Sequence, residues 1–185
     1  MSGVEILSVC TGNVCRSPAA ERLLAEALSP LGVHVTSAGT DAPVGAPISE
    51  EMARLLLAAG VDAADHRARR LSGDDIRRAD LVLGMSGEHR SHVVEFEPAA
   101  LRRSFTLLEL AAIARLVPAA ELEPGPADAA PSDRLRALIR LAPRYRGQAA
   151  AGDIDDPIGC DEATYARVFA QIQGAVDLIA TVVAR

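Results

Sequence analysis

The sequence predicts an α/β domain in which the strands of a parallel sheet alternate with helices. Two observations support this prediction. Short apolar runs at residues 4–9, 33–37 and 81–85 are typical of buried strands, and segments with apolar residues at helical spacing lie between them. Strands separated in this way pair in parallel through right-handed crossovers. Catalytic residues are then expected in the loops beyond the carboxyl ends of the strands.

The first strand leads through a loop, residues 10–17, into a helix. Ser17 suits the N-cap of this helix and Pro18 its first position, because proline has no N–H to leave unpaired there. Gly32 ends the helix. Glu21 is expected on the solvent face. The apolar face, which should pack on the sheet, consists of Ala20, Leu23, Leu24, Ala27, Leu28 and Leu31.

The later elements follow from the same patterns. We expect strands at 33–37, 81–85 and 104–107, and helices at 49–59, 72–78, 87–96, 132–145 and 161–184. Residues 117–131 contain four prolines and predict a surface loop, which is either disordered or shapes access to a substrate. The arginines that follow form either a solvated face or a basic wall for an anionic substrate: Arg134, Arg136, Arg140, Arg144 and Arg146.

Composition favours a single domain over residues 1–185, since 49% hydrophobic residues can build one core. The net charge of −6 and the aromatic content of 3% argue against nucleic-acid binding. No basic leader or stretch of about 18 apolar residues indicates secretion or membrane insertion. The odd number of cysteines, three, suits a reducing compartment, so we expect a cytoplasmic protein.

The loop after the first strand has the residues of an anion site. Unpaired amides and the positive end of the helix dipole favour negative charge there, and Gly12 permits close approach. Arg16 can bind two phosphate oxygens at once, and the same positive field favours the thiolate of Cys10. Alternatively, Cys10 is a small buried side chain and Arg16 a surface cation. The loop lacks both nucleotide-binding glycine motifs, so no nucleotide is implied.

The segment from Cys10 to Glu21 resembles the signature of the low-molecular-weight protein tyrosine phosphatases. Four further segments resemble the family in the same order: residues 37–40 (SAGT), 66–69 (HRAR), 79–85 and Asp156-Pro157. The resemblance weakens between about residues 95 and 152. It implies a three-layer fold with flavodoxin-like winding, in which helices cover both faces of a four-stranded parallel sheet and the phosphatase loop follows the first strand.

The resemblance implies hydrolysis of a phosphate monoester through a phosphocysteine intermediate. Cys10 attacks phosphorus, Arg16 holds the phosphoryl oxygens, and Asp156 donates a proton to the leaving group and later activates water. Ser17 hydrogen-bonds the departing thiolate. The phosphate-binding loop consists of Thr11, Gly12, Asn13, Val14, Cys15 and Ser17. Asp153 and Asp155 are rivals of Asp156 as the acid, although Pro157 restricts the backbone of Asp156.

Other residues have alternative interpretations. Asn13 is expected to brace the loop by hydrogen bonds, with Ser37 and His66 as its partners in the family pattern or as simple turn residues. Cys15 either forms the reversible disulfide with Cys10 that the resemblance suggests or packs in the core. Cys160 is incidental. His89 and His92 share a helix face but lack a third ligand, so neither a metal nor another cofactor is predicted.

The expected substrate is a phosphorylated protein, with phosphotyrosine favoured, or a small phosphoester. Ile158-Gly159 stands where phosphotyrosine-specific relatives often carry two aromatic residues, which reduces the wall for a phenyl ring. Val14 replaces the threonine of phosphoarginine phosphatases and favours phosphotyrosine. A thiol-dependent arsenate reductase is the alternative activity, but residues 79–90 contain no resolving cysteine. A non-catalytic phosphate-binding protein is the third hypothesis.

Overall fold

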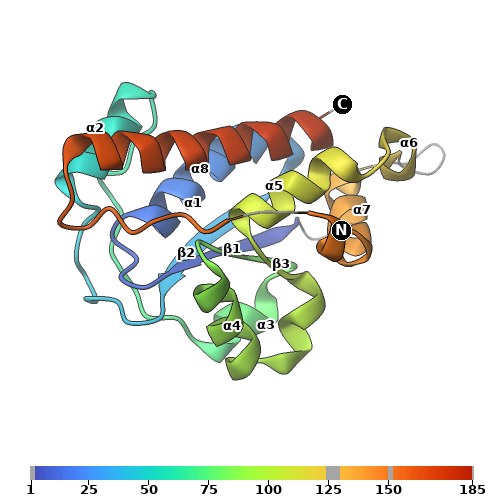
Figure 1. Cartoon of the computed structure of the whole chain (residues 1–185), viewed down its shortest axis with the longest axis horizontal. Coiled ribbons are helices and arrows are strands. Elements are labelled where there is room, and N and C mark those ends of the chain that lie inside the picture. Colours follow the sequence, from blue (N-terminus) through green and yellow to red (C-terminus); the bar gives the residue numbers. More distant parts are fainter. Residues whose placement is uncertain (1–2, 124–129, 150–151, 185) are drawn as a thin grey trace.

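The computed structural model describes residues 3–123, 130–149 and 152–184. These residues form the predicted four-stranded parallel sheet, in the order β2-β1-β3-β4. The strands are β1 (Glu5–Cys10), β2 (His34–Gly39), β3 (Leu81–Gly84) and β4 (Ser104–Thr106). Because the strands are parallel, the segments that follow β1, β2 and β3 leave the sheet at the same end, as Figure 1 shows.

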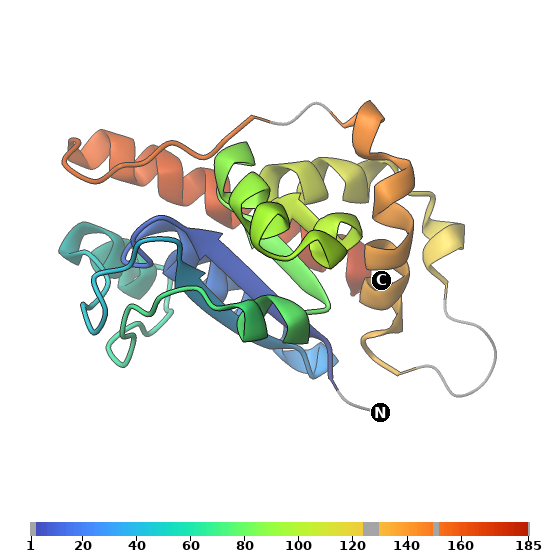
Figure 2. The ribbon, with the colours of Figure 1, turned by 90° about the horizontal axis from the view of Figure 1, so that it is seen from below.

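Helices cover both faces of the sheet. The helices α1 (Arg16–Leu28), α5 (Leu107–Leu116) and α8 (Glu162–Val183) lie on one face, and α3 (Gly73–Arg78) and α4 (Gly87–Phe96) lie on the other (Figures 1 and 2). Alternate strand residues supply the two cores. Ile6 and Leu83 face the first group of helices, whereas Leu7 and Val82 face the second. The predicted three layers are therefore confirmed.

The last helix, α8, is long and apolar enough to cross a membrane by length and composition, with a mean hydropathy of 1.3 in its most apolar window. Its residues Val168, Ile172 and Ile179 are buried in the larger core. Both α1 and α5 pack against it. One side of α8 is therefore buried against the other helices, and α2 (Glu50–Ala58) also packs against it.

The first helix begins two residues earlier than the sequence predicted. Cys15, not Ser17, is the N-cap, and α1 begins at Arg16. Ser17 cannot act as the cap because its hydroxyl lies 3.0 Å from Cys10 Sγ and belongs to the loop. Pro18 still lies in the first turn, where its missing N–H costs no hydrogen bond. Beyond Leu28 the chain tightens into a 3-10 turn, Ser29–Leu31.

Helix α5 was not predicted from the sequence. After β4, α5 begins at a capping box in which Thr106 Oγ1 accepts the Glu109 N–H at 3.0 Å and the Glu109 carboxylate accepts the Thr106 N–H at 3.3 Å. This Thr-x-x-Glu pattern, followed by apolar residues at helical spacing, is a recognisable start signal. The expected strand had been extended to Leu107, which is the first residue of the helix.

The start of the predicted surface loop, residues 117–123, is partly helical. It contains α6 (Ala119–Leu122), whereas residues 124–129 of the predicted loop lie outside the described residues. The next helix, α7 (Asp133–Leu141), lies toward the end of the sheet at which the chain begins (Figures 1 and 2). It therefore does not form a basic wall beside the loop that follows β1. Arg134 pairs with Glu123 at 2.7 Å, and Arg146 lies over the Phe105 ring.

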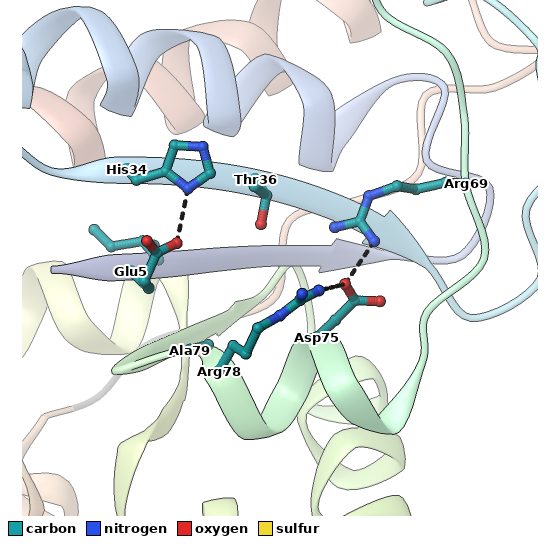
Figure 3. A pocket seen from close by; sticks show the side chains of 8 residues that line it. Glu5, His34, Thr36, Arg69, Asp75, Arg78 and Ala79 are labelled. Carbon is teal, nitrogen blue, oxygen red and sulfur yellow. Dashed lines mark hydrogen bonds and ion pairs between the residues drawn. The ribbon is translucent and has the colours of Figure 1, made fainter. Parts of the chain in front are cut away.

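A reciprocal capping box also fixes the start of α3. Ser72 Oγ accepts the Asp75 N–H at 3.3 Å, and Asp75 accepts the Ser72 N–H at 3.0 Å. Figure 3 shows Arg69 and Arg78 converging on the same carboxylate, at 2.8 and 3.3 Å, beside a hollow of about 510 Å³. Burial alone would raise the pKa of Asp75, but hydrogen bonds from Ser72 and Arg69 outweigh it and lower that pKa.

Replacing Asp75 with Asn is expected to lower the free energy of unfolding by about 1–2 kcal/mol at neutral pH, because the cap and two arginine partners are weakened. Because the pKa of Asp75 is lower in the folded state than its ordinary value of 3.8, the carboxylate stabilises the fold fully at pH values above 3.8. This stabilisation is lost as the pH falls below 3.8 and through the lowered pKa. Denaturant unfolding at several pH values should show the difference shrinking in acid. The exposed neighbour Asp74 serves as the control, since Asp74→Asn should change little.

Candidate active site

The loop between β1 and α1 is held in a conformation that few residues can adopt. Asn13 has a φ of 53°, in the left-handed region, where asparagine is better tolerated than most residues. The end of β2 passes so close that a Cβ at Gly39 would lie 2.4 Å from the Thr11 carbonyl oxygen. Glycine is therefore required at position 39. Gly39 belongs to the segment 37–40 that resembles the family, but its spacing in the sequence carried no signal for this close approach.

Cys10 is the last residue of β1 and is only 2% exposed. Its Sγ accepts the Asn13 backbone N–H at 3.3 Å and lies 3.0 Å from Ser17 Oγ. Two donors can thus stabilise negative charge on the sulfur. The arrangement suits a thiolate that attacks a bound group and a thiolate that is later released from that group.

The side chain of Asn13 connects the loop to the rest of the protein. Its amide nitrogen donates to Ser17 Oγ at 3.0 Å and to Ser37 Oγ at 2.7 Å, and its Oδ1 accepts the Arg69 N–H at 2.9 Å. His66 Nε2 donates to the Asn13 carbonyl oxygen at 2.8 Å. The structure therefore brings together Asn13, Ser17, Ser37 and His66. Since Ser17 accepts from Asn13, its own proton remains for Cys10.

Glu21 belongs to this network and not to the solvent face, so that expectation was wrong. Its side chain is 18% exposed, and its carboxylate accepts a short hydrogen bond from the Ser37 hydroxyl. Ser37 therefore accepts from Asn13 and donates to Glu21. The sequence contained a usable signal, because Glu21 lies one helical turn after Ser17 and shares its face of α1.

Arg16 is 5% exposed, which excludes the alternative of a surface cation. Its Nη1 donates to the Ile154 carbonyl oxygen at 3.1 Å, and its Nη2 forms a short ion pair with Asp156. Within the described part of the chain, its Nε is buried without a hydrogen-bond partner. The guanidinium therefore retains a buried donor, which an anion in the loop could satisfy.

The structure separates the three candidate acids. Asp153 accepts the Gly87 backbone N–H at 2.8 Å at the start of α4, and Asp155 pairs with Arg167 at 2.8 Å. Asp156 is the one that reaches Arg16, and its side chain is 47% exposed. Asp156 therefore contacts the guanidinium of Arg16 on one side and solvent on the other.

The other cysteines are free and differ in environment. Cys15 is 2% exposed and lies in the larger core, where burial raises the pKa of its thiol to about 12. It is therefore protonated at neutral pH and a poor nucleophile. No disulfide joins Cys10 to Cys15 in this structure, and Cys160 is exposed.

His89 is a further residue that the sequence analysis did not connect with the loop. It is 5% exposed, and its Nε2 lies 3.0 Å from Thr11 Oγ1. Burial lowers the pKa of His89 to about 4, and the charge of Arg16 also lowers it, so the ring is neutral at pH 7. His92 is exposed beside Phe96. Across residues 3–123, 130–149 and 152–184, no group of three or more His, Cys, Asp or Glu residues could hold a metal ion.

Comparison with known proteins agrees with this geometry. The profile of the family described as low molecular weight phosphotyrosine protein phosphatase matches residues 5–113. The probable low molecular weight protein-tyrosine-phosphatase EpsP of Ralstonia solanacearum is 40% identical over 105 residues, which cover 57% of this chain and 71% of the relative. The protein-arginine-phosphatase of Geobacillus stearothermophilus is 43% identical over 102 residues, covering 55% and 68% of the two chains.

The solved structures extend the similarity beyond residue 113. The YwlE arginine phosphatase of Geobacillus stearothermophilus superimposes with a TM-score of 0.72 and 30% sequence identity, over 96% of this chain and 91% of that one. The residues matched by the family profile include the loop after the first strand, and the solved structure shares the fold. The chain therefore belongs to the low-molecular-weight protein tyrosine phosphatase family.

Proposed function

We propose that this phosphatase hydrolyses phosphate monoesters through a phosphocysteine intermediate, with Cys10, Arg16 and Asp156 as its catalytic residues. One observation carries the proposal. The buried thiol of Cys10 and the buried guanidinium of Arg16 flank one loop, and Asp156 reaches the same guanidinium. A nucleophile, a group that binds the phosphoryl oxygens and a proton donor are the components that the reaction requires.

In the first step, the Cys10 thiolate attacks phosphorus and a sulfur–phosphorus bond forms. The bond from phosphorus to the leaving oxygen breaks, and Asp156 transfers its proton to that oxygen. Arg16 and the loop amides hold the remaining phosphoryl oxygens, including the charge that the transition state spreads over them. An incoming dianion competes with Asp156 for Arg16. This step needs the carboxyl of Asp156 in its protonated form.

In the second step, Asp156, now a carboxylate, accepts a proton from water, and the water oxygen attacks phosphorus. The sulfur–phosphorus bond breaks and inorganic phosphate leaves. The returning thiolate is stabilised by the Ser17 hydroxyl and the Asn13 N–H, which already lie at 3.0 and 3.3 Å from Cys10 Sγ. The same residue therefore serves first as acid and then as base.

For the substrate, we propose protein phosphotyrosine. The family to which the chain belongs is described as phosphotyrosine protein phosphatase, and this supports the choice. Ile158, which is 50% exposed and follows Asp156-Pro157, offers a smaller apolar wall to the phenyl ring than two aromatic residues would. Val14, within the loop, adds no hydroxyl. Phosphoarginine is the second candidate, because one relative at 43% identity is named a protein-arginine-phosphatase. The absence of cysteine from residues 79–90 disfavours arsenate reduction.

We also propose a cytoplasmic location and phosphorylated proteins as partners. The mechanism needs a reduced thiol, and the three cysteines are all free. A net charge of −6 disfavours nucleic acids and anionic membrane surfaces as ligands. We treat the chain as one catalytic domain, since the first and last helices, α1 and α8, pack against each other.

Replacing Cys10 with Ser is expected to reduce turnover of p-nitrophenyl phosphate by about 10⁴-fold or more, because the nucleophile is lost. Steady-state release of p-nitrophenol measures the effect. Cys160→Ser, at the exposed cysteine, is the matched control and should retain activity. A fully active Cys10→Ser protein would refute the covalent mechanism, and thiol consumption that depends on arsenate would point to reduction instead.

Asp156→Asn is expected to slow turnover of phenyl phosphate by about 10²–10³-fold, since phenol leaves poorly without a proton. Turnover of p-nitrophenyl phosphate should fall much less, because p-nitrophenolate leaves well unaided. Comparison of kcat for the two esters measures this selectivity. Asp155→Asn, which removes the pair with exposed Arg167, should leave both rates nearly unchanged. Equal losses on both esters would exclude Asp156 as the general acid.

Peptides carrying phosphotyrosine, phosphoarginine or phosphoserine should rank with phosphotyrosine first in kcat/KM. Val14→Thr is expected to raise the ratio of phosphoarginine to phosphotyrosine hydrolysis, because a hydroxyl then faces the substrate where a methyl group stood. Val14→Ala controls for the change in volume. Faster wild-type hydrolysis of phosphoarginine would overturn the proposed substrate while leaving the catalytic residues in place.

A further inference from the structure

A buried histidine outside the catalytic set touches the first loop residue after the nucleophile. His89 lies in the first turn of α4 and is 5% exposed. Its Nε2 is 3.0 Å from Thr11 Oγ1. From the opposite direction, the Thr11 carbonyl oxygen accepts the Asp41 N–H at 2.9 Å. Thr11 is therefore held by its side chain to α4 and by its backbone to the segment after β2.

The surrounding hydrogen bonds determine which ring nitrogen carries the proton. Ser86 Oγ accepts the His89 backbone N–H at 3.3 Å as the N-cap of α4. The proton of this hydroxyl can be donated to His89 Nδ1, which lies 2.7 Å away. A neutral ring whose Nδ1 accepts a hydrogen bond carries its proton on Nε2. His89 Nε2 then donates to Thr11 Oγ1. The proton of the Thr11 hydroxyl is not used in this contact and remains available to another acceptor.

We propose that His89 is a positioning residue that acts through Thr11 to hold the phosphate loop in its binding conformation. The inference rests on the proposed function and extends it to α4. Loop amides that are fixed before the anion arrives lose no conformational freedom when charge develops on the phosphoryl oxygens. Because the ring is neutral, it braces the loop without adding a second positive charge beside Arg16.

The same turn of α4 also receives the segment that carries the acid. Asp153 accepts the Gly87 N–H at 2.8 Å, and the Ile154 N–H donates to the Met85 carbonyl oxygen at 2.9 Å. Residues that precede Asp156 are thus anchored beside His89. The first turn of α4 therefore sets the nucleophile loop and the acid segment relative to each other.

A double-mutant cycle tests the proposal. His89→Leu removes the donor, Thr11→Val removes its acceptor, and His89→Gln retains an amide donor near the position of Nε2. His92→Gln, at the exposed histidine one turn along α4, is the matched control. Two readouts are needed: kcat/KM for p-nitrophenyl phosphate, and protection of Cys10 from iodoacetamide by inorganic phosphate in a Cys160→Ser background.

We expect His89→Leu and Thr11→Val each to lower kcat/KM by about 10-fold and to weaken phosphate protection similarly. The kcat/KM of the double variant should lie within about twofold of that of the less active single variant. Independent effects would instead multiply, and kcat/KM would fall by about 100-fold. His89→Gln should recover most of the loss, and His92→Gln should resemble the wild type. Unfolding curves establish that each variant is folded. Should the Leu variant not fold, the cycle is run with His89→Asn, which cannot place a donor at Nε2.

Multiplicative losses, or a Leu variant as active as the wild type, would overturn the proposal. The two readouts separate this failure from failure of the proposed function. A wild-type protein that binds phosphate but releases no p-nitrophenol would contradict the phosphatase mechanism, and the protection assay would still decide the role of His89.

Discussion

The hydrogen bonds of Asn13 hold the phosphate loop in the shape on which the rest of the site depends. Its backbone N–H points at Cys10 Sγ, and its side chain binds Ser17, Ser37 and the backbone of Arg69. A buried amide with all these bonds made is stable, but the loss of one partner would leave a buried polar group unsatisfied. The left-handed backbone of this residue is thereby fixed by contacts from three separate segments.

Two opposite charges, Arg16 and Asp156, lie beside the loop. Arg16 is buried at the start of α1, and its main countercharge, Asp156, comes from the far end of the chain. In the proposed mechanism, a substrate dianion replaces that carboxylate on the guanidinium and so frees Asp156 to act as the acid. Cys15, with its raised pKa, contributes to the core and not to the chemistry. Of the two cysteines in the loop, Cys10 is therefore the one that we propose as the nucleophile.

Much of the fold could be predicted from local sequence patterns, and the predictions that were wrong have physical causes. Strands β1 and β3 and helix α4 were predicted almost to the residue, because short buried strands and capped helices have strong signals. The start of α1 was misplaced because Ser17 uses its hydroxyl for Cys10 instead of for a cap. Helix α5 was missed although Thr106 and Glu109 mark its start. Glu21 was misplaced because its buried partner, Ser37, lies in a different element, β2.

The sequence by itself determined the kind of chemistry. The spacing of Cys10 and Arg16 around a loop that joins a strand to a helix specifies an anion site with a nucleophile, because local geometry decides where those side chains and amides lie. Tertiary structure decided which carboxylate reaches Arg16 and which polar residues hydrogen-bond the loop. Asp156, Asp153 and Asp155 are near neighbours in sequence, yet only the packing of their segment against α4 and Arg16 separates their roles. The contact of His89 with Thr11 spans 78 residues, a separation at which no periodic pattern carries information.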